Sequence, residues 1–178
     1  PRHVLVGVHL GAPDNPYGKI WPAARFGAVC RRLRDEVGAE PFFVGGPEEA
    51  KAVAAARAAA GFEIPSWAGR CRLVETFALI ERCGLFLSND TGLAKAAMAL
   101  RVPTLTLWGP TDPAELGAWE PVGHRDLRLN IPCSPCVRVG MPRGRDGIDY
   151  TDCGHRRCLG ELGDDAVFRA ARKAYLPG

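Results

Sequence analysis

The chain has 178 residues, of which 47% are hydrophobic and 24% charged, so it can bury one substantial core, and we expect a single domain. The net charge of +3 does not by itself indicate a nucleic-acid partner, and no apolar run approaches the roughly 20 residues of a membrane helix. The sequence opens at Pro1 without a signal peptide and enters a strand-like run almost at once, so we expect a fragment of a longer protein.

Strands and helices alternate along the chain. Residues 3–10 form an apolar run that suits a buried parallel strand. A helix should begin near Trp21 and end at Gly38, because apolar side chains recur at three-to-four spacing from Phe26 to Leu33. The elements expected next are a strand over 41–46, helices over 47–60 and 73–83, a strand over 85–88, a helix over 91–100, a strand over 104–108 and a helix over 165–175. This order predicts an α/β fold, a Rossmann-like parallel sheet with helices on both faces.

The loop at residues 15–19 (NPYGK) follows the first strand. Gly18 allows a close approach of the backbone and Lys19 supplies a cation, which together suit a phosphate group. A P-loop is excluded, because six residues rather than four separate Gly11 from Gly18 and because Ile20 stands where a magnesium-binding Ser or Thr is needed. The alternative is an exposed lysine in a polar turn.

The second strand is followed by residues 45–49 (GGPEE). A carboxylate of Glu48 or Glu49 at this edge of the sheet can accept hydrogen bonds from ribose hydroxyls. The alternative is that these glutamates only favour the positive end of the helix that they begin.

Residues 88–95 (SNDTGLAK) lead from a strand into a helix. The amides at such a helix N-terminus favour an anion, the Thr91 hydroxyl adds a donor, Gly92 removes steric obstruction, and Lys95 adds charge one turn later. The alternative is that Asp90 merely caps the helix while Gly92 eases packing.

Four of the seven cysteines are clustered: Cys133, Cys136, Cys153 and Cys158. Two thiolates two residues apart can bind one tetrahedral ion, and the later pair can complete the site. We therefore expect a structural zinc or iron site on a four-Cys loop insertion at about 132–159, with reduced thiols or two disulfides as alternatives. Cys30, Cys71 and Cys83 lie in apolar or helical segments, where a buried thiol acts as a small hydrophobe.

Several catalytic motifs are missing from the sequence. It contains no G-x-G-x-x-G fingerprint, no G-x-S-x-G elbow and no H-E-x-x-H pair. It also contains no Asp-x-Asp pair that would hold a divalent ion, so we expect no cofactor for catalysis.

Three of these segments together resemble glycosyltransferase family 9, the ADP-heptose heptosyltransferases. They are residues 18–22 (GKIWP), residues 45–49 and, most specifically, residues 89–113 (NDTGLAKAAMALRVPTLTLWGPTDP). The Cys-x-Pro-Cys stretch with a later Cys-Leu also occurs in that family. The resemblance covers about residues 4–176.

The resemblance implies a two-lobed GT-B enzyme of which this chain is the C-terminal half. Its ligand would be an ADP-activated heptose, transferred with inversion to a lipopolysaccharide core or to protein. The acceptor site and the general base would belong to an N-terminal half that this chain lacks, so the isolated half should be inactive. The family also implies a location in the cytoplasm or at the periphery of the inner membrane.

The same resemblance assigns the donor site. Lys19 would contact the pyrophosphate and stabilise the leaving group, Glu48 or Glu49 would contact the ribose, and Lys95 is a second catalytic candidate. The full set of expected donor-binding residues is Asn15, Lys19, Gly46, Glu48, Glu49, Asp90, Thr91, Gly92, Leu93 and Lys95. Lys95 departs from the family, which usually carries His there. A subgroup that glycosylates protein is said to hold iron on its four-cysteine finger.

Two other functions compete with this one. Half of a GT-B enzyme can bind a nucleotide sugar without turning it over. Alternatively, the cysteine loop can be a metal ribbon that binds nucleic acid through Arg138, Arg143, Arg145, Arg156 and Arg157. Asp146, Asp149 and Asp152 share that loop, which argues against nucleic acid as a partner.

Overall fold

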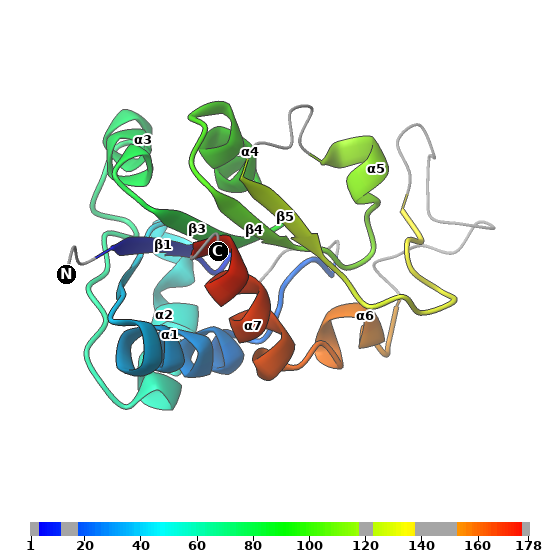
Figure 1. The fold of residues 1–178 in the computed structure, drawn as a ribbon. Helices are drawn as coiled ribbons and strands as arrows, with labels where there is room; N and C mark the ends of the chain where they lie inside the picture. The colour runs from blue at the N-terminus through cyan, green and yellow to red at the C-terminus, as the bar shows by residue number, and fades with distance from the viewer. Residues whose placement is uncertain (1–3, 12–17, 118–122, 138–152, 176–178) are drawn as a thin grey trace.

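A computed structural model of the chain describes residues 4–11, 18–117, 123–137 and 153–175. Its centre is a five-stranded parallel sheet with the strand order β2-β1-β3-β4-β5 (Figure 1). The strands are β1 (Leu5–His9), β2 (Glu40–Phe43), β3 (Leu85–Asn89), β4 (Thr104–Leu107) and β5 (His124–Leu127). The helices are α1 (Ala23–Val37), the 3₁₀ turn η1 (Pro47–Glu49), α2 (Ala50–Ala60), α3 (Leu73–Glu81), α4 (Gly92–Ala99), α5 (Pro113–Leu116), α6 (Arg157–Gly160) and α7 (Asp164–Tyr175).

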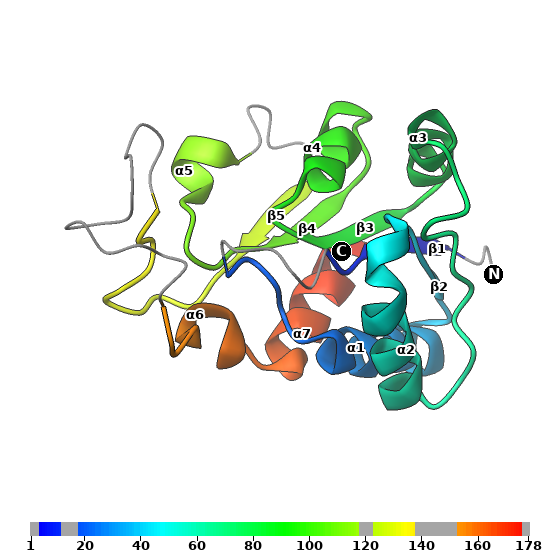
Figure 2. The same ribbon diagram turned by 180° about the vertical axis from the view of Figure 1, so that it is seen from behind.

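Helices cover both faces of the sheet, as the alternating pattern predicts. Figures 1 and 2 show α1, α2 and α7 on one face and α3 and α4 on the other. On the first face, buried Val6 and Val8 of β1 pack with Phe26 of α1 and Phe168 of α7. On the second face, a smaller core joins the sheet to α3 and α4, with Phe86 at its centre. Both faces of β3 are therefore buried, and all five of its residues are inaccessible to solvent.

The strand order reverses next to β1. The chain passes from β1 to β2 on one side and then returns to the other side of β1 for β3, β4 and β5. In open parallel sheets, ligands bind beyond the carboxyl ends of the strands at such a switch point. This places the candidate site where β1 and β3 end, with His9 beside Ser88 in the register of the two strands.

Most expected elements are confirmed, with bounds that differ by a few residues. Gly38 and Gly61 end α1 and α2 in the left-handed conformation that glycine favours. The helix expected over 47–60 begins as a 3₁₀ turn, and the strand expected over 41–46 already ends at Phe43.

Three elements are not foreseen by the sequence pattern: α5, β5 and α6. The two helices have four residues each, too few to show a helical period. Strand β5 has the sequence HRDL and lies at the edge of the sheet with two exposed residues, so it lacks the apolar signal of a central strand.

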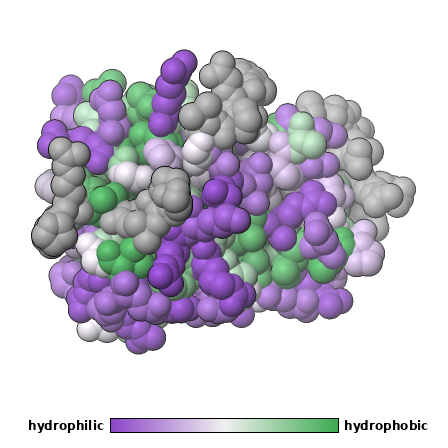
Figure 3. Space-filling view, in the orientation of Figure 1, coloured by the Kyte–Doolittle hydropathy of each residue, from purple (hydrophilic) through white to green (hydrophobic). Residues whose placement is uncertain are grey.

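In the orientation of Figure 1, the described residues present no extended apolar face (Figure 3). Figure 3 shows a mostly hydrophilic face on which hydrophobic residues form separate patches. Among the described residues, no helix is both long and apolar enough to cross a membrane.

Helices α1 and α2 approach until their backbones touch. A Cβ atom added at Gly27 of α1 would lie 1.9 Å from the backbone oxygen of Ala56 in α2. Only glycine permits this approach, and the two helices follow the strands whose loops carry Lys19 and Glu49.

We expect the Gly27→Ala substitution to lower the free energy of unfolding by about 1–3 kcal/mol, because the new methyl group must push two backbones apart. Urea denaturation of the chain measures this loss. Gly160→Ala is the matched control, because a Cβ at that helical glycine meets nothing within 4 Å. Equal losses in the two variants would contradict the argument from close packing.

Candidate functional site

The carboxyl ends of β1 and β3 carry a group of buried polar side chains. His9 ends β1, and Ser88, Asn89 and Asp90 lie at the end of β3, all with 8% or less of their surface exposed. Buried polar groups need partners, so each of these side chains must be paired within the protein. Their partners come from three loops that are distant in the sequence.

Asp90 is the acceptor for two lysines and one hydroxyl. Lys19 Nζ lies 2.7 Å from Asp90 Oδ2, and the Thr111 hydroxyl donates to the same oxygen at 2.9 Å. Lys95 Nζ lies 3.4 Å from the other oxygen, Oδ1. The structure thus brings Lys19, Asp90 and Lys95 together, three residues that the sequence singles out in separate motifs.

The charges around Asp90 determine its ionisation. Burial alone would raise the pKa of the Asp90 carboxyl, but the hydrogen bond and charge of Lys19, the Thr111 hydroxyl and the charge of Lys95 outweigh burial and hold its pKa below the usual value. Asp90 is therefore a carboxylate at neutral pH.

Asn89 fastens the loop that carries Lys19. Asn89 Nδ2 donates to the carbonyl of Leu10 at 2.7 Å, and Oδ1 accepts from the backbone N–H of Trp21 at 3.0 Å. One buried amide thus holds the described ends of the loop between β1 and α1.

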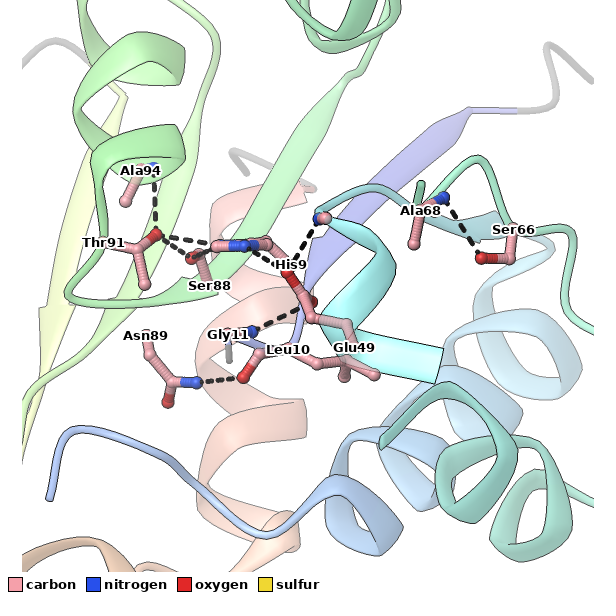
Figure 4. Close-up of polar contacts among 11 residues, drawn as sticks. His9, Leu10, Gly11, Glu49, Ser66, Ala68, Ser88, Asn89, Thr91 and Ala94 are labelled. Carbon is pink, nitrogen blue, oxygen red and sulfur yellow. Dashed lines mark hydrogen bonds and ion pairs between the residues drawn. The ribbon is translucent and has the colours of Figure 1, made fainter. Parts of the chain in front are cut away.

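His9 links β1 to the two neighbouring loops (Figure 4). Its Nε2 lies 2.9 Å from Glu49 Oε1, and its Nδ1 lies 2.9 Å from the Thr91 hydroxyl. Thr91 caps α4 by accepting from the N–H of Ala94, and it also contacts Ser88 at 3.0 Å. His9 therefore fixes the position of the α4 N-terminus relative to the loop after β2.

The two glutamates of residues 45–49 differ in their surroundings. Glu49 is 1% exposed, and beyond His9 its oxygens accept from the backbone N–H groups of Gly11 at 3.1 Å and Gly46 at 3.3 Å. Glu48 is exposed and lies over Gly46, where a Cβ would be 2.2 Å from its carboxylate oxygens. The carboxylate of Glu49 is occupied by hydrogen bonds within the protein, whereas Glu48 is exposed to solvent.

The remaining expected donor residues differ in their exposure to solvent, and one of them is not described. Gly92 is exposed at the start of α4, and a Cβ there would meet nothing within 4 Å. Leu93 is half-buried against the smaller core. Asn15 lies outside the described residues.

Three site residues are missed by the sequence argument: His9, Thr111 and Trp108. The Lys95 ammonium lies over the Trp108 ring, 4.5 Å from its centroid. A polar residue at the end of an apolar strand was a signal for His9, but nothing in the pattern predicted its partners.

The segment that carries the four clustered cysteines (the cysteine segment, about residues 132–159) is attached through its described residues to the loop after β4. The Ser134 hydroxyl donates to the carbonyl of Gly109 at 2.7 Å, and the N–H groups of Cys136 and Val137 both donate to the carbonyl of Pro110 at 2.8 Å. The side chain of Cys158 packs near Gly109 from the other end of the segment. Both ends therefore rest on the loop that carries Thr111.

The four clustered thiols lie near enough to influence one another. Burial raises the pKa of Cys136, and the charges of Cys153 and Cys133 raise it further. Burial also raises the pKa of Cys158, and the other three cysteines add to it. All seven cysteines are free thiols. Within the described part of the chain, no three His, Cys, Asp or Glu side chains are gathered closely enough to hold a metal ion.

The three other cysteines lie apart from this cluster. Cys30 and Cys83 are buried, and burial raises the pKa of each thiol to about 12, as expected for small core residues. Cys71 differs from the expectation, because it is half-buried in a bend between α2 and α3.

Comparison with known proteins identifies relatives of one kind. The model of glycosyltransferase family 9 (heptosyltransferase) matches residues 2–144. Lipopolysaccharide heptosyltransferase 1 of Pseudomonas aeruginosa is 32% identical over 122 residues, which are 67% of this chain and 33% of the relative. The chain thus spans about a third of the length of that curated relative.

Solved structures share the fold. The Escherichia coli ADP-heptose lipopolysaccharide heptosyltransferase II matches with a TM-score of 0.76 and 22% identity, over 98% of this chain and 47% of that one. The iron-containing dodecameric glycosyltransferase TibC of enterotoxigenic E. coli matches with a TM-score of 0.68 and 14% identity, over 98% of this chain and 47% of that one.

We expect Glu49→Gln to lower the free energy of unfolding by about 1–3 kcal/mol, because an amide nitrogen replaces one of the buried oxygens and cannot accept the hydrogen bonds made there. Thermal or urea denaturation measures the loss. Glu48→Gln, one residue away and exposed, should leave stability unchanged. If the two variants were equally stable, Glu49 would not act as an internal acceptor.

Proposed function

Because this chain belongs to glycosyltransferase family 9, we propose that it is the donor-binding part of a heptosyltransferase and that its ligand is an ADP-activated heptose. The match of the family model to residues 2–144 supports the reaction class. The chain covers about half of the matching heptosyltransferase II structure, which leaves room for a second lobe that binds the acceptor.

The observation that carries this proposal is the placement of Lys19 beside the N-terminus of α4 at the switch point of the sheet. A helix leaves its first amides without partners inside the helix, so they are available to an anion. At Gly92, no side chain covers the start of the helix, and a Cβ there would meet nothing described within 4 Å. A diphosphate placed there would meet a lysine on one side and helix amides on the other.

The same groups suit the chemistry of glycosyl transfer. An acceptor hydroxyl attacks the anomeric carbon, the bond from that carbon to the diphosphate oxygen breaks, and ADP departs with the bonding electrons. Once Lys19 turns from Asp90 to the diphosphate, its ammonium and the first amides of α4 can stabilise the charge that develops on the leaving oxygen. Attack from the opposite side inverts the anomeric centre. The base that removes the hydroxyl proton would come from the acceptor lobe.

We assign the ribose contact to Glu48 rather than Glu49. Both oxygens of Glu49 are used by His9 and by backbone N–H groups, whereas Glu48 is exposed beside Gly46. Asn15, Thr91 and Leu93 complete the proposed donor site. The acceptor is the core of a lipopolysaccharide, in line with the name of the P. aeruginosa relative, or a protein.

We also propose a structural zinc or iron ion at Cys133, Cys136, Cys153 and Cys158, on an insertion at about 132–159. Four cysteine thiols are a donor set suited to a thiophilic ion. Binding would have to draw them together, because no three such side chains of the described residues are gathered closely enough in this structure. The structural relative TibC is an iron-containing glycosyltransferase, which supports iron as one of the two candidates. Such an ion would stabilise the cysteine segment and would take no part in transfer.

For donor binding, we expect calorimetry to show tighter binding of ADP and ADP-sugars than of UDP or GDP compounds. Lys19→Met should weaken ADP binding by about 10- to 100-fold, because a hydrogen bond to a charged group contributes about 1.5–3 kcal/mol. Lys51→Met is the control, because Lys51 is exposed on α2.

Other outcomes would separate the parts of the proposal. A preference for UDP would refute the ADP donor but not the fold. Transfer by this chain alone, at rates typical of complete enzymes, would refute the need for a second lobe. Binding without transfer after the acceptor lobe is supplied would indicate a nucleotide-sugar sensor.

For the cysteines, elemental analysis should find about one zinc or iron per chain, since four thiolates close around a single ion in a structural site. Cys136→Ser should lose most of the metal, whereas Cys71→Ser, outside the cluster, should retain it. Mass spectrometry without reductant provides the contrary outcome. If the chain binds no metal and its mass is below that of the fully reduced chain by the four hydrogens lost in forming two disulfides, the metal site is wrong.

A further inference from the structure

Lys95 is held by the protein on three sides. Its ammonium lies 3.4 Å from Asp90 Oδ1, donates to the carbonyl of Leu116 at the end of α5, and sits over the ring of Trp108. Trp108 is itself fixed, because it is fully buried and its Nε1 donates to Asp126 at 2.6 Å. The Lys95 side chain is 38% exposed, yet its ammonium has three partners within the protein.

The two lysines of the site occupy different oxygens of one carboxylate. Lys19 and Thr111 contact Oδ2, and Lys95 contacts Oδ1. With both lysines in place the Asp90 side chain is only 5% exposed, so its charge is balanced by protein groups rather than by bulk water.

Donor binding creates a conflict at this carboxylate. Lys19 is the proposed ligand of the diphosphate, yet its ammonium also holds Asp90 Oδ2. If Lys19 turns towards the diphosphate, Asp90 keeps only the Thr111 hydroxyl on that oxygen. A buried carboxylate without a cation is costly, and removing one partner from a buried ion pair is strongly destabilising. Some other cation must therefore remain beside Asp90.

We propose that Lys95 is the resident counter-ion of Asp90 and keeps this carboxylate ionised while Lys19 transfers its hydrogen bond to the bound diphosphate. The inference rests on the proposed function, in that a diphosphate is the ligand of Lys19. Lys95 is then a positioning residue that acts through Asp90, and it does not contact the donor.

A permanent cation suits this role. A lysine beside a carboxylate stays charged over the whole physiological range, whereas an imidazole ordinarily loses its charge near neutral pH. Among the described residues, the groups that contact the Asp90 carboxylate are Lys19 from the loop before α1, Lys95 from α4 and Thr111 from the loop after β4. From β1, His9 reaches Thr91 rather than Asp90. Without Lys95, the departure of Lys19 would leave the carboxylate to take up a proton.

The test measures proton uptake when the 178-residue chain binds ADP or inorganic pyrophosphate. Calorimetry in two buffers of different ionisation enthalpy, between about pH 5 and 7, gives the number of protons bound. Lys95→Met should take up more protons than wild type, by up to one per ADP bound. It should also bind ADP about 10-fold more weakly at neutral pH, with the difference shrinking as the pH falls.

Three further variants serve as controls. Lys95→Arg should restore the wild-type proton count, because it restores the cation. Lys51→Met should behave as wild type. In an Asp90→Asn background, Lys95→Met should change neither the proton count nor the affinity, because the carboxylate to be compensated is gone. Circular dichroism checks that each variant is folded.

The possible results are distinct. Wild-type proton uptake by Lys95→Met overturns the counter-ion role. A loss of affinity in Lys95→Met that persists in the Asp90→Asn background overturns it in favour of direct contact between Lys95 and the diphosphate. If pyrophosphate binds but ADP does not, the donor assignment fails while the counter-ion role is still tested. If wild type binds neither ligand, the proposed function fails and the counter-ion role fails with it.

Discussion

The ionised carboxylate of Asp90 sets the arrangement of the whole candidate site. It is almost completely buried, so its charge must be balanced by groups brought from elsewhere in the chain. The loop before α1 brings Lys19, α4 brings Lys95, and the loop after β4 brings Thr111. The loop after β4 also supports the cysteine segment through the Pro110 carbonyl. One buried charge thus orders three strand-to-helix loops and, through them, the segment beyond β5.

A second buried carboxylate, that of Glu49, also brings separate loops together, on the other side of β1. Glu49 draws His9, Gly11 and Gly46 together, and His9 passes the constraint to Thr91 at the start of α4. The two acids leave different groups available to a ligand. Around Asp90, the groups available to a ligand are an ammonium and helix amides, which suit a diphosphate. Beside Glu49, the available group is the exposed carboxylate of Glu48, which suits hydroxyls.

The sequence pattern was sufficient to predict the central strands and the long helices. Strands β1 and β3 are buried, largely apolar runs, and the buried side chains of α1 recur at three-to-four spacing. The pattern failed at β5, whose polar residues lack an apolar signal and are held by backbone pairing with β4 and by the hydrogen bond from Trp108 to Asp126. For the site, the motifs located Lys19, Asp90 and Thr91, since each follows a strand. They could not distinguish Glu48 from Glu49 or find Thr111, because these roles depend on which side chains the fold buries. Lys95 was identified as a charge, but its contact with the Trp108 ring exists only in three dimensions.

The strand order that creates the site also determines when it can exist. Lys19 and Asp90 are 71 positions apart, His9 and Thr91 are 82 apart, and Trp21 reaches across 141 positions to Leu162. A nascent chain that has emerged from the ribosome only as far as α3 contains Lys19 and His9 but neither Asp90 nor Thr91. Contacts of such separation form after local ones, because the intervening chain must first be closed into a loop. The candidate site is therefore completed only after the chain has been synthesised beyond β3, and a ligand that binds there stabilises only chains in which β1 and β3 have already paired.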